Sequence, residues 1–145
     1  MPTTFRQDIV AGLVTILDGF KTANPTLLRH TFSARPPGFN TDLPCAFVGP
    51  RPETATHSQG IRTRTLSGLS VSFVDRLTDN AETMTRMDVL VDAFADYLTA
   101  RPHVIPGTIW NTWTVIDEQL DIGDGTALQV VTFTLPDLSI SEGRV

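Results

Sequence analysis

Apolar side chains recur at every third or fourth position of residues 4–22, which is the spacing of one face of an α-helix. They are Phe5, Ile9, Leu13, Ile16, Leu17 and Phe20. Thr3 or Thr4 can cap this helix, and Asn24-Pro25 ends it, because the residue before a proline is disfavoured in the helical region. A helix with one apolar stripe buries that stripe against a second layer, so the rest of the chain has to supply one.

The alternation of side chains in residues 61–75 predicts that this layer is a β-sheet. One parity is apolar or β-branched: Ile61, Thr63, Thr65, Leu69, Val71 and Phe73. The other parity is polar: Arg62, Arg64, Ser70 and Ser72. A period of two is typical of a half-buried strand, here with a bulge expected near Ser67-Gly68. Further strands are expected at 27–33, 45–49, 109–120 and 126–135, and a Gly-Asp-Gly turn makes the last two a hairpin.

A second amphipathic helix is predicted over residues 80–99, before Pro102 and Pro106. Its apolar stripe consists of Met84, Met87, Leu90, Val91, Phe94 and Leu98. Asp88, Asp92 and Asp96 are spaced four residues apart, so all three carboxylates share one face of the helix.

This order of elements predicts an α+β fold, in which two helices pack on one face of a mainly antiparallel sheet of about five strands. The 145 residues are expected to form a single domain with an ordered core over about 4–138. Residues 50–60 contain no large apolar side chain, so a flexible, exposed loop is expected there. Residues 139–145 are expected to form a frayed tail.

Composition excludes several classes of protein. Cys45 is the single cysteine, so neither an internal disulfide nor a multi-cysteine zinc site is possible. Eleven basic and sixteen acidic residues give a net charge of −5, the opposite of what gripping DNA phosphates requires. The N-terminal apolar residues are interrupted by Arg6 and Asp8, so no signal peptide is expected. No window approaches the roughly 20 apolar residues of a membrane span, so no membrane partner is expected.

The residues that usually carry catalysis form no recognisable motif. His30, His57 and His103 lie in three separate segments without metal-ligand spacing, and no Gly-x-Ser-x-Gly elbow is present. Cys45 lies in an apolar run, which is typical of a small buried side chain rather than a nucleophile. The Asp88, Asp92 and Asp96 face is interpreted as solvated, and the acidic cluster at 117–124 as a solubilising turn. We therefore predict no catalytic, metal-binding or cofactor-binding residues, and no cofactor.

Two tryptophans raise the possibility of a second layer or a partner. Trp110 and Trp113 are three residues apart on a predicted strand, so they point to opposite faces. One of them then faces away from the core, as aromatic residues of interfaces do. A bulge or a covering loop that buries both is the alternative.

The order of these segments resembles the tail terminator (tail completion) proteins of long-tailed phages, the lambda U-like family. The resemblance covers essentially residues 4–138 and rests on element order. After the N-terminal helix come the Pro-flanked strand LPCAFVGP (43–50), the polar loop and the run RTRTLSGLSVSFVDR (62–76). Asn80-Ala81-Glu82 then leads to the helix MDVLVDAFADYL (87–98) and to a hairpin ending in VVTFTLP (130–136).

The resemblance implies a structural protein of the virion, made in the host cytoplasm. Such proteins form a ring, usually hexameric, that caps the tail tube at its final length and presents a surface to the head–tail connector. The implied partners are other copies of the chain, the major tail tube protein and connector proteins, and DNA passes through without specific binding. The residues expected at an interface with another subunit or the tail tube are Arg51, Glu53, His57, Arg62, Arg64, Asp88, Asp92, Asp96 and Trp110.

Two alternatives remain at this point. A neighbouring head–tail connector or minor tail protein has a similar size and layout. A small α+β enzyme or ligand-binding domain would have a pocket in which His30 or His103 meets a carboxylate. The polar loop at 51–60 either becomes ordered against a neighbour on assembly or is an ordinary surface loop.

Overall fold

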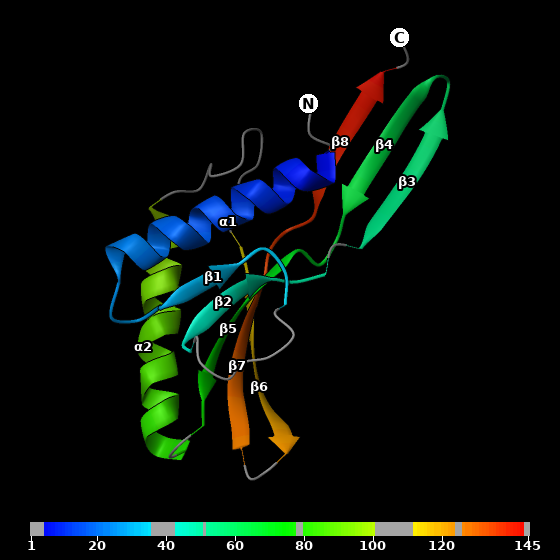
Figure 1. Cartoon of the computed structure of the whole chain (residues 1–145). Coiled ribbons are helices and arrows are strands. Elements are labelled where there is room, and N and C mark those ends of the chain that lie inside the picture. Colours follow the sequence, from blue (N-terminus) through cyan, green and yellow to red (C-terminus); the bar gives the residue numbers. More distant parts are fainter. Residues whose placement is uncertain are drawn as a thin grey trace.

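The computed structural model describes residues 5–35, 43–50, 52–77, 80–100, 112–123 and 126–143, and the structural statements below concern these residues. They form two helices and eight strands (Figure 1). The helices are α1 (Phe5–Ala23) and α2 (Asn80–Thr99). The strands are β1 (His30–Phe32), β2 (Cys45–Val48), β3 (Glu53–Ser58), β4 (Ile61–Leu66), β5 (Ser70–Arg76), β6 (Thr114–Gly123), β7 (Thr126–Thr134) and β8 (Leu138–Gly143).

The predicted α+β fold is confirmed. A five-stranded sheet has the order β1-β2-β5-β7-β6, and every pair in it is antiparallel except β1–β2, which is parallel. The sheet is therefore mixed, which the sequence analysis did not predict. Both helices are confirmed to within one residue, and β6 and β7 form the expected antiparallel pair. We refer to this sheet with α1 and α2 as the body.

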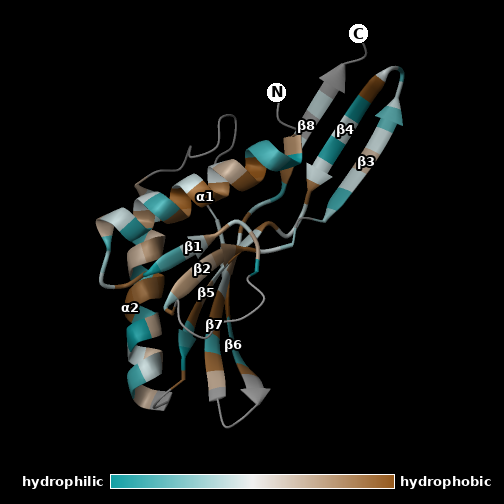
Figure 2. Cartoon of the chain, in the orientation of Figure 1, coloured by the Kyte–Doolittle hydropathy of each residue, from teal (hydrophilic) through white to brown (hydrophobic). Residues whose placement is uncertain are grey.

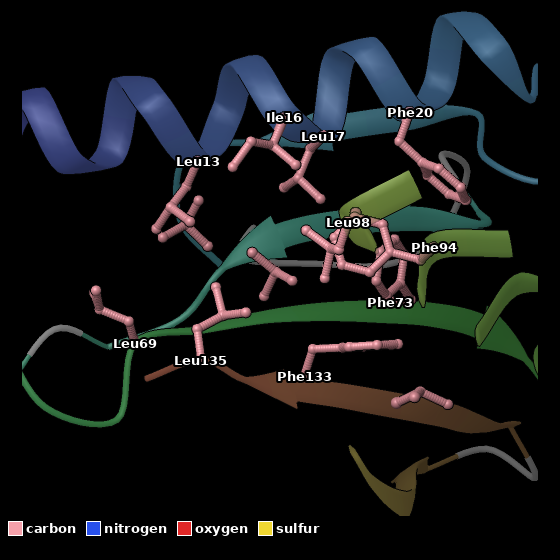
Figure 3. Packing of buried hydrophobic residues seen from close by; sticks show 14 of the residues in the cluster. Leu13, Ile16, Leu17, Phe20, Leu69, Phe73, Phe94, Leu98, Phe133 and Leu135 are labelled. Carbon is pink, nitrogen blue, oxygen red and sulfur yellow. The ribbon is translucent and has the colours of Figure 1, made fainter. Parts of the chain in front are cut away.

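The main core lies between the two helices and one face of the body sheet. All five residues of the α1 stripe from Ile9 to Phe20 are buried, as the helical spacing requires. At the centre, four phenylalanine rings from both helices and two strands meet edge to face (Figure 3). They are Phe20, Phe73, Phe94 and Phe133, with ring centroids 4.8–5.9 Å apart. These contacts fix where α2 lies relative to the C-terminal half of α1.

The opposite face of the body sheet carries a second cluster of buried apolar residues. Its buried members are Cys45, Phe47, Val74, Leu128 and Val130. The cysteine is 1% exposed, in agreement with its interpretation as a buried apolar residue. Buried apolar clusters lie on both faces of the sheet here. Residues 70–74 of β5 are all buried and do not show the predicted half-buried alternation.

The prediction of a flexible loop at 50–60 is wrong. Residues 53–58 form β3, which pairs along its whole length with β4 through a turn at Gln59-Gly60. Both turn residues have positive φ, 52° and 80°, as a tight two-residue hairpin turn requires. Thr54–Ser58 are exposed, so β3 is held by backbone pairing and leaves no hydrophobic pattern in the sequence.

Two other predictions are wrong because β4 and β8 belong to a second sheet and not to the body sheet. The strand expected at 61–75 is two strands in different sheets, and the chain changes direction at Gly68, which has a φ of 64°. The expected frayed tail contains β8, which pairs with β4 from Leu66↔Leu138 to Ile61↔Gly143. Residues 144 and 145 lie outside the described residues.

Strands β3, β4 and β8 form a three-stranded antiparallel sheet in the order β3-β4-β8, which we call the arm. Figure 1 shows the arm extending away from the body past the N-terminal end of α1. Figure 2 shows that most of the arm is hydrophilic, whereas hydrophobic residues concentrate in the body. Of the arm side chains that the structure describes, Leu66 and Leu138 are buried, and both lie at its base.

Candidate assembly interface

A cluster of four side chains joins the base of the arm to α1, and we call it the clasp. Glu53 starts β3 and lies diagonally across from Arg64 of β4, since Arg64 is the partner of Ala55 in the β3–β4 register. The Arg64 Nε donates to Glu53 Oε2 (3.0 Å) and its Nη2 to Oε1 (2.8 Å). Arg6 Nη1 of α1 donates to the same Oε1 (3.3 Å). The Arg64 guanidinium also lies 5.0 Å from the centre of the Phe5 ring.

The clasp changes the interpretation of two predicted interface residues. Glu53 is part of a strand rather than of a polar loop, and hydrogen bonds from Arg64 above all, and from Arg6, hold the pKa of its carboxyl below its ordinary value. Arg64 was expected to point outward, but its side chain is only 16% exposed and is engaged within its own chain. A sequence cannot show this contact, because its partner Phe5 is 59 residues away along the chain.

The stabilisation that the Glu53 carboxylate provides is expected to depend on pH. A lowered folded-state pKa means that this stabilisation is complete above about pH 4.5 and is lost as the pH falls through the lowered value. Glu53→Gln is therefore expected to lower the free energy of unfolding at pH 7 and to match the wild type at the acidic end. Urea unfolding between pH 7 and pH 3 measures both curves.

Glu82→Gln is the matched control for that measurement. Glu82 is 69% exposed and lies 3.6 Å from Arg86, a solvated pair of the kind that contributes little. Its curve is expected to run parallel to that of the wild type. A Glu53→Gln deficit that stayed the same at every pH would contradict the role of the carboxylate charge.

The distal half of the arm brings together two other predicted interface residues. His57 of β3 is the direct cross-strand partner of Arg62 of β4, and both are exposed. Arg62 is in turn the register partner of Glu142 in β8. Ile61, the first residue after the turn, is 50% exposed. It was assigned to the buried parity of a body strand, and it is exposed because β4 belongs to the arm.

The exposed face of α2 carries the three aspartates that were expected to share it. Asp88, Asp92 and Asp96 are all exposed. Val89 lies on the same face, one helical turn before Asp92, and is 52% exposed. Within the described part of the chain, no group of three or more histidine, cysteine, aspartate or glutamate residues could hold a metal ion.

Some predicted positions lie outside the described residues. Arg51, Trp110 and His103 are among them, so their proposed roles stay predictions. Trp113 is described: it is partly buried and packs against the main core.

The sequence analysis missed a group of exposed aliphatic residues, which are candidates for an interface. Apart from Ile61 and Val89, they are Val115 (37% exposed) and Ile116 (55% exposed) on β6, an edge strand of the body sheet. Neighbouring strand residues point to opposite faces, so these two lie on different faces of the edge. Exposed Asp117 and Glu118 follow them.

Two surface cavities of similar size are formed by the described residues of the body. One, of about 420 Å³, lies on the sheet face opposite the helices and is lined by Phe47, Val74, Val130 and Glu118 among others. The other, of about 440 Å³, lies beside α2 and is described below. His30, one of the two histidines of the enzyme alternative, lines neither of these two cavities.

Likeness to known proteins is found at the level of three-dimensional structure. No protein-family model and no curated protein matches the chain. A chain of the solved structure titled "Virion of native gene transfer agent (GTA) particle" is similar over 89% of this chain and 98% of that one. The two are 12% identical and the TM-score is 0.49, a level of likeness from which we draw no functional argument. Neither described helix is long and apolar enough to cross a membrane.

Proposed function

We propose that this chain is a structural protein of a phage virion, a tail terminator whose copies form a ring on the head-proximal end of the tail tube. The observation that carries the proposal is the arm. Small sheets need a hydrophobic face or a packed layer to be stable in water, and the distal arm has neither among its described side chains. Its outer strands β3 and β8 also leave their outer edges unpaired within the described residues. Such an element gains stability when a partner covers it.

Other copies of the same chain are suitable partners, because the arm and the acidic face of α2 lie at opposite ends of the molecule. The clasp holds the arm at Phe5 and Arg6, whereas α2 packs at Phe20, near the other end of α1. The 19 residues of α1 span about 28 Å. A contact between two different surfaces of identical subunits is head-to-tail, and a ring results when the rotation closes.

The charges on these two surfaces are of opposite sign. Arg62 lies on the distal arm, and Asp88, Asp92 and Asp96 lie on α2. Arg64, which was expected to contribute to the basic surface, is engaged in the clasp and is left out of the proposed contact. Complementary charges favour one orientation of the partner over others, which a ring of a single geometry requires.

The remaining parts of the proposal follow from the family resemblance. The ring is proposed to be a hexamer that contacts the major tail tube protein on one side and head–tail connector proteins on the other, with no enzymatic step. DNA has to pass through such a ring without adhering to it. A net charge of −5 is compatible with an acidic channel that repels phosphates.

Disruption of the gene tests the proposal and separates it from the connector alternative. A terminator defect is expected to give tails of abnormal length that are not joined to heads, seen by negative-stain electron microscopy. Tails of normal length that are not joined to heads would instead favour a connector protein. Complementation with the wild-type gene is the control, since it has to restore both length and joining.

A further inference from the structure

The second of these body cavities lies where α2, the turn between α1 and β1, Pro44 before β2 and the end of β5 meet. It has a volume of about 440 Å³ and is open to the surface. Its apolar lining comes from Leu27, Pro44, Met87, Val89 and Leu90, and its polar lining from Thr26, Asp75, Arg76, Thr85 and Arg86. The apolar side chains belong to three separate segments, so the fold as a whole makes this surface.

The cavity opens beside the acidic face of α2. Val89 contributes to the cavity and is 52% exposed, and Asp88 and Asp92 are its neighbours on the helix. Arg76 and Arg86 are the basic residues of the lining, and Arg86 contacts Asp75 at 3.2 Å and Glu82 at 3.6 Å. Together with Asp88 and Asp92, these carboxylates outnumber the two arginines. A cavity with an apolar lining and an excess of carboxylates beside it favours an apolar group flanked by positive charge.

The tip of the arm has that chemistry. Ile61 is the one large aliphatic residue of the β3–β4 hairpin before its buried base, and half of its surface is exposed. The arginines of the hairpin are Arg62 and Arg64. Arg64 is engaged with Glu53 in the clasp, and Arg62, which follows Ile61, is the register partner of Glu142 on β8. Covering Ile61 removes apolar surface from water, and Arg62 beside it supplies a positive charge.

The tip cannot be expected to occupy the cavity of its own chain. It projects away from the body beyond the N-terminal end of α1, whereas α2 packs at the C-terminal half of α1 (Figure 1). From these observations we infer that the β3–β4 tip of one copy docks in the α2 cavity of a second copy, with Ile61 against Val89. The inference rests on the proposed ring and adds to it the two surfaces that join neighbouring subunits. Each copy has one tip and one cavity, so every contact in the ring is the same.

Disulfide trapping tests this pairing directly. The variants are Ile61→Cys and Val89→Cys, and the native Cys45 is 1% exposed, so it does not compete. A mixture of the two single variants is expected to give a covalent dimer under mild oxidation, whereas each variant alone is not. A disulfide forms only when the two Cα atoms come within about 7 Å, so the trap reports close contact even if assembly is transient. The double variant is expected to give a ladder on denaturing gels that stops at the number of subunits in the ring.

Ile116→Cys mixed with Val89→Cys is the matched control. Ile116 is also isoleucine and is 55% exposed, but it lies on β6 rather than on the arm. The arm pair is expected to give at least ten times as much dimer as this control pair. An equal or larger yield from the control pair, or no dimer from the arm pair, would overturn the inference.

Failure of the docking inference and failure of the proposed function give different results. Complementing the disrupted gene with Ile61→Asp is expected to give the same tail defect as no complementation. If Ile61→Asp restored normal particles while the disruption itself produced the tail defect, the docking would be wrong and the terminator function would stand. If the disruption left tails of normal length joined to heads, the proposed function would be wrong, whatever the cross-linking showed.

Discussion

Reversing two charges on α2, as Asp92→Arg with Asp96→Arg, is expected to break the assembled protein into monomers that remain folded. Both side chains are exposed, so the substitutions leave the core intact. They place positive charge opposite Arg62 of the neighbouring arm, and like charges facing each other at an interface cost several kcal/mol. A loss of about 2 kcal/mol per contact weakens each contact about thirtyfold, and a ring has one such contact for every subunit.

Size-exclusion chromatography with light scattering measures this effect, under conditions in which the wild-type protein assembles. The control is Asp117→Arg with Glu118→Arg, a pair of equally acidic, exposed residues on β6. The control variant is expected to keep the wild-type mass, and circular dichroism verifies that both variants are folded. An Asp92→Arg/Asp96→Arg variant with the wild-type mass would contradict the head-to-tail contact.

The second large effect concerns the fold itself. Phe94→Ala is expected to destabilise the protein by about 3–5 kcal/mol, because it removes a buried ring and leaves a cavity. The Phe94 ring lies 4.8, 4.9 and 5.1 Å from the rings of Phe73, Phe133 and Phe20, so both helices and the sheet lose contacts. Natural domains have a total stability of only about 5–15 kcal/mol, so the variant is expected to be close to unfolding.

Urea unfolding followed by circular dichroism measures that loss. Val89→Ala is the control on the same helix, since Val89 is 52% exposed and surface substitutions usually change stability by less than about 0.5 kcal/mol. A Phe94→Ala variant destabilised by less than about 1 kcal/mol would show that the aromatic cluster does not hold α2 on the sheet.

The body of the fold was predictable because burial leaves a period in the sequence. The stripe of α1 falls on one helical face, and every member from Ile9 to Phe20 is buried. The exposure of Asp88, Asp92 and Asp96 followed from the same spacing on α2. In each case the position of a residue along its own helix determines which side it presents.

The arm was not predictable because backbone pairing, rather than burial, holds it together. Thr54–Ser58 are exposed, so β3 has no alternation to detect, and Gln59-Gly60 was the only local signal of the hairpin. The alternation in 61–75 was real, but it extends across Gly68 into a different sheet, which placed Ile61 on the wrong side. The exposure of Ile61 and the clasp on Arg64 both depend on segments far apart in the sequence.

The length distribution of tails made without this protein tests the central claim most directly. A ring that caps the tube at its final length stops further addition of tube protein, so its loss is expected to give a broad distribution that extends beyond the wild-type length. Electron micrographs of particles from the disrupted gene, beside those from the complemented gene, give both distributions. A narrow distribution at the wild-type length, with tails joined to heads, would contradict the assignment of this chain as a tail terminator.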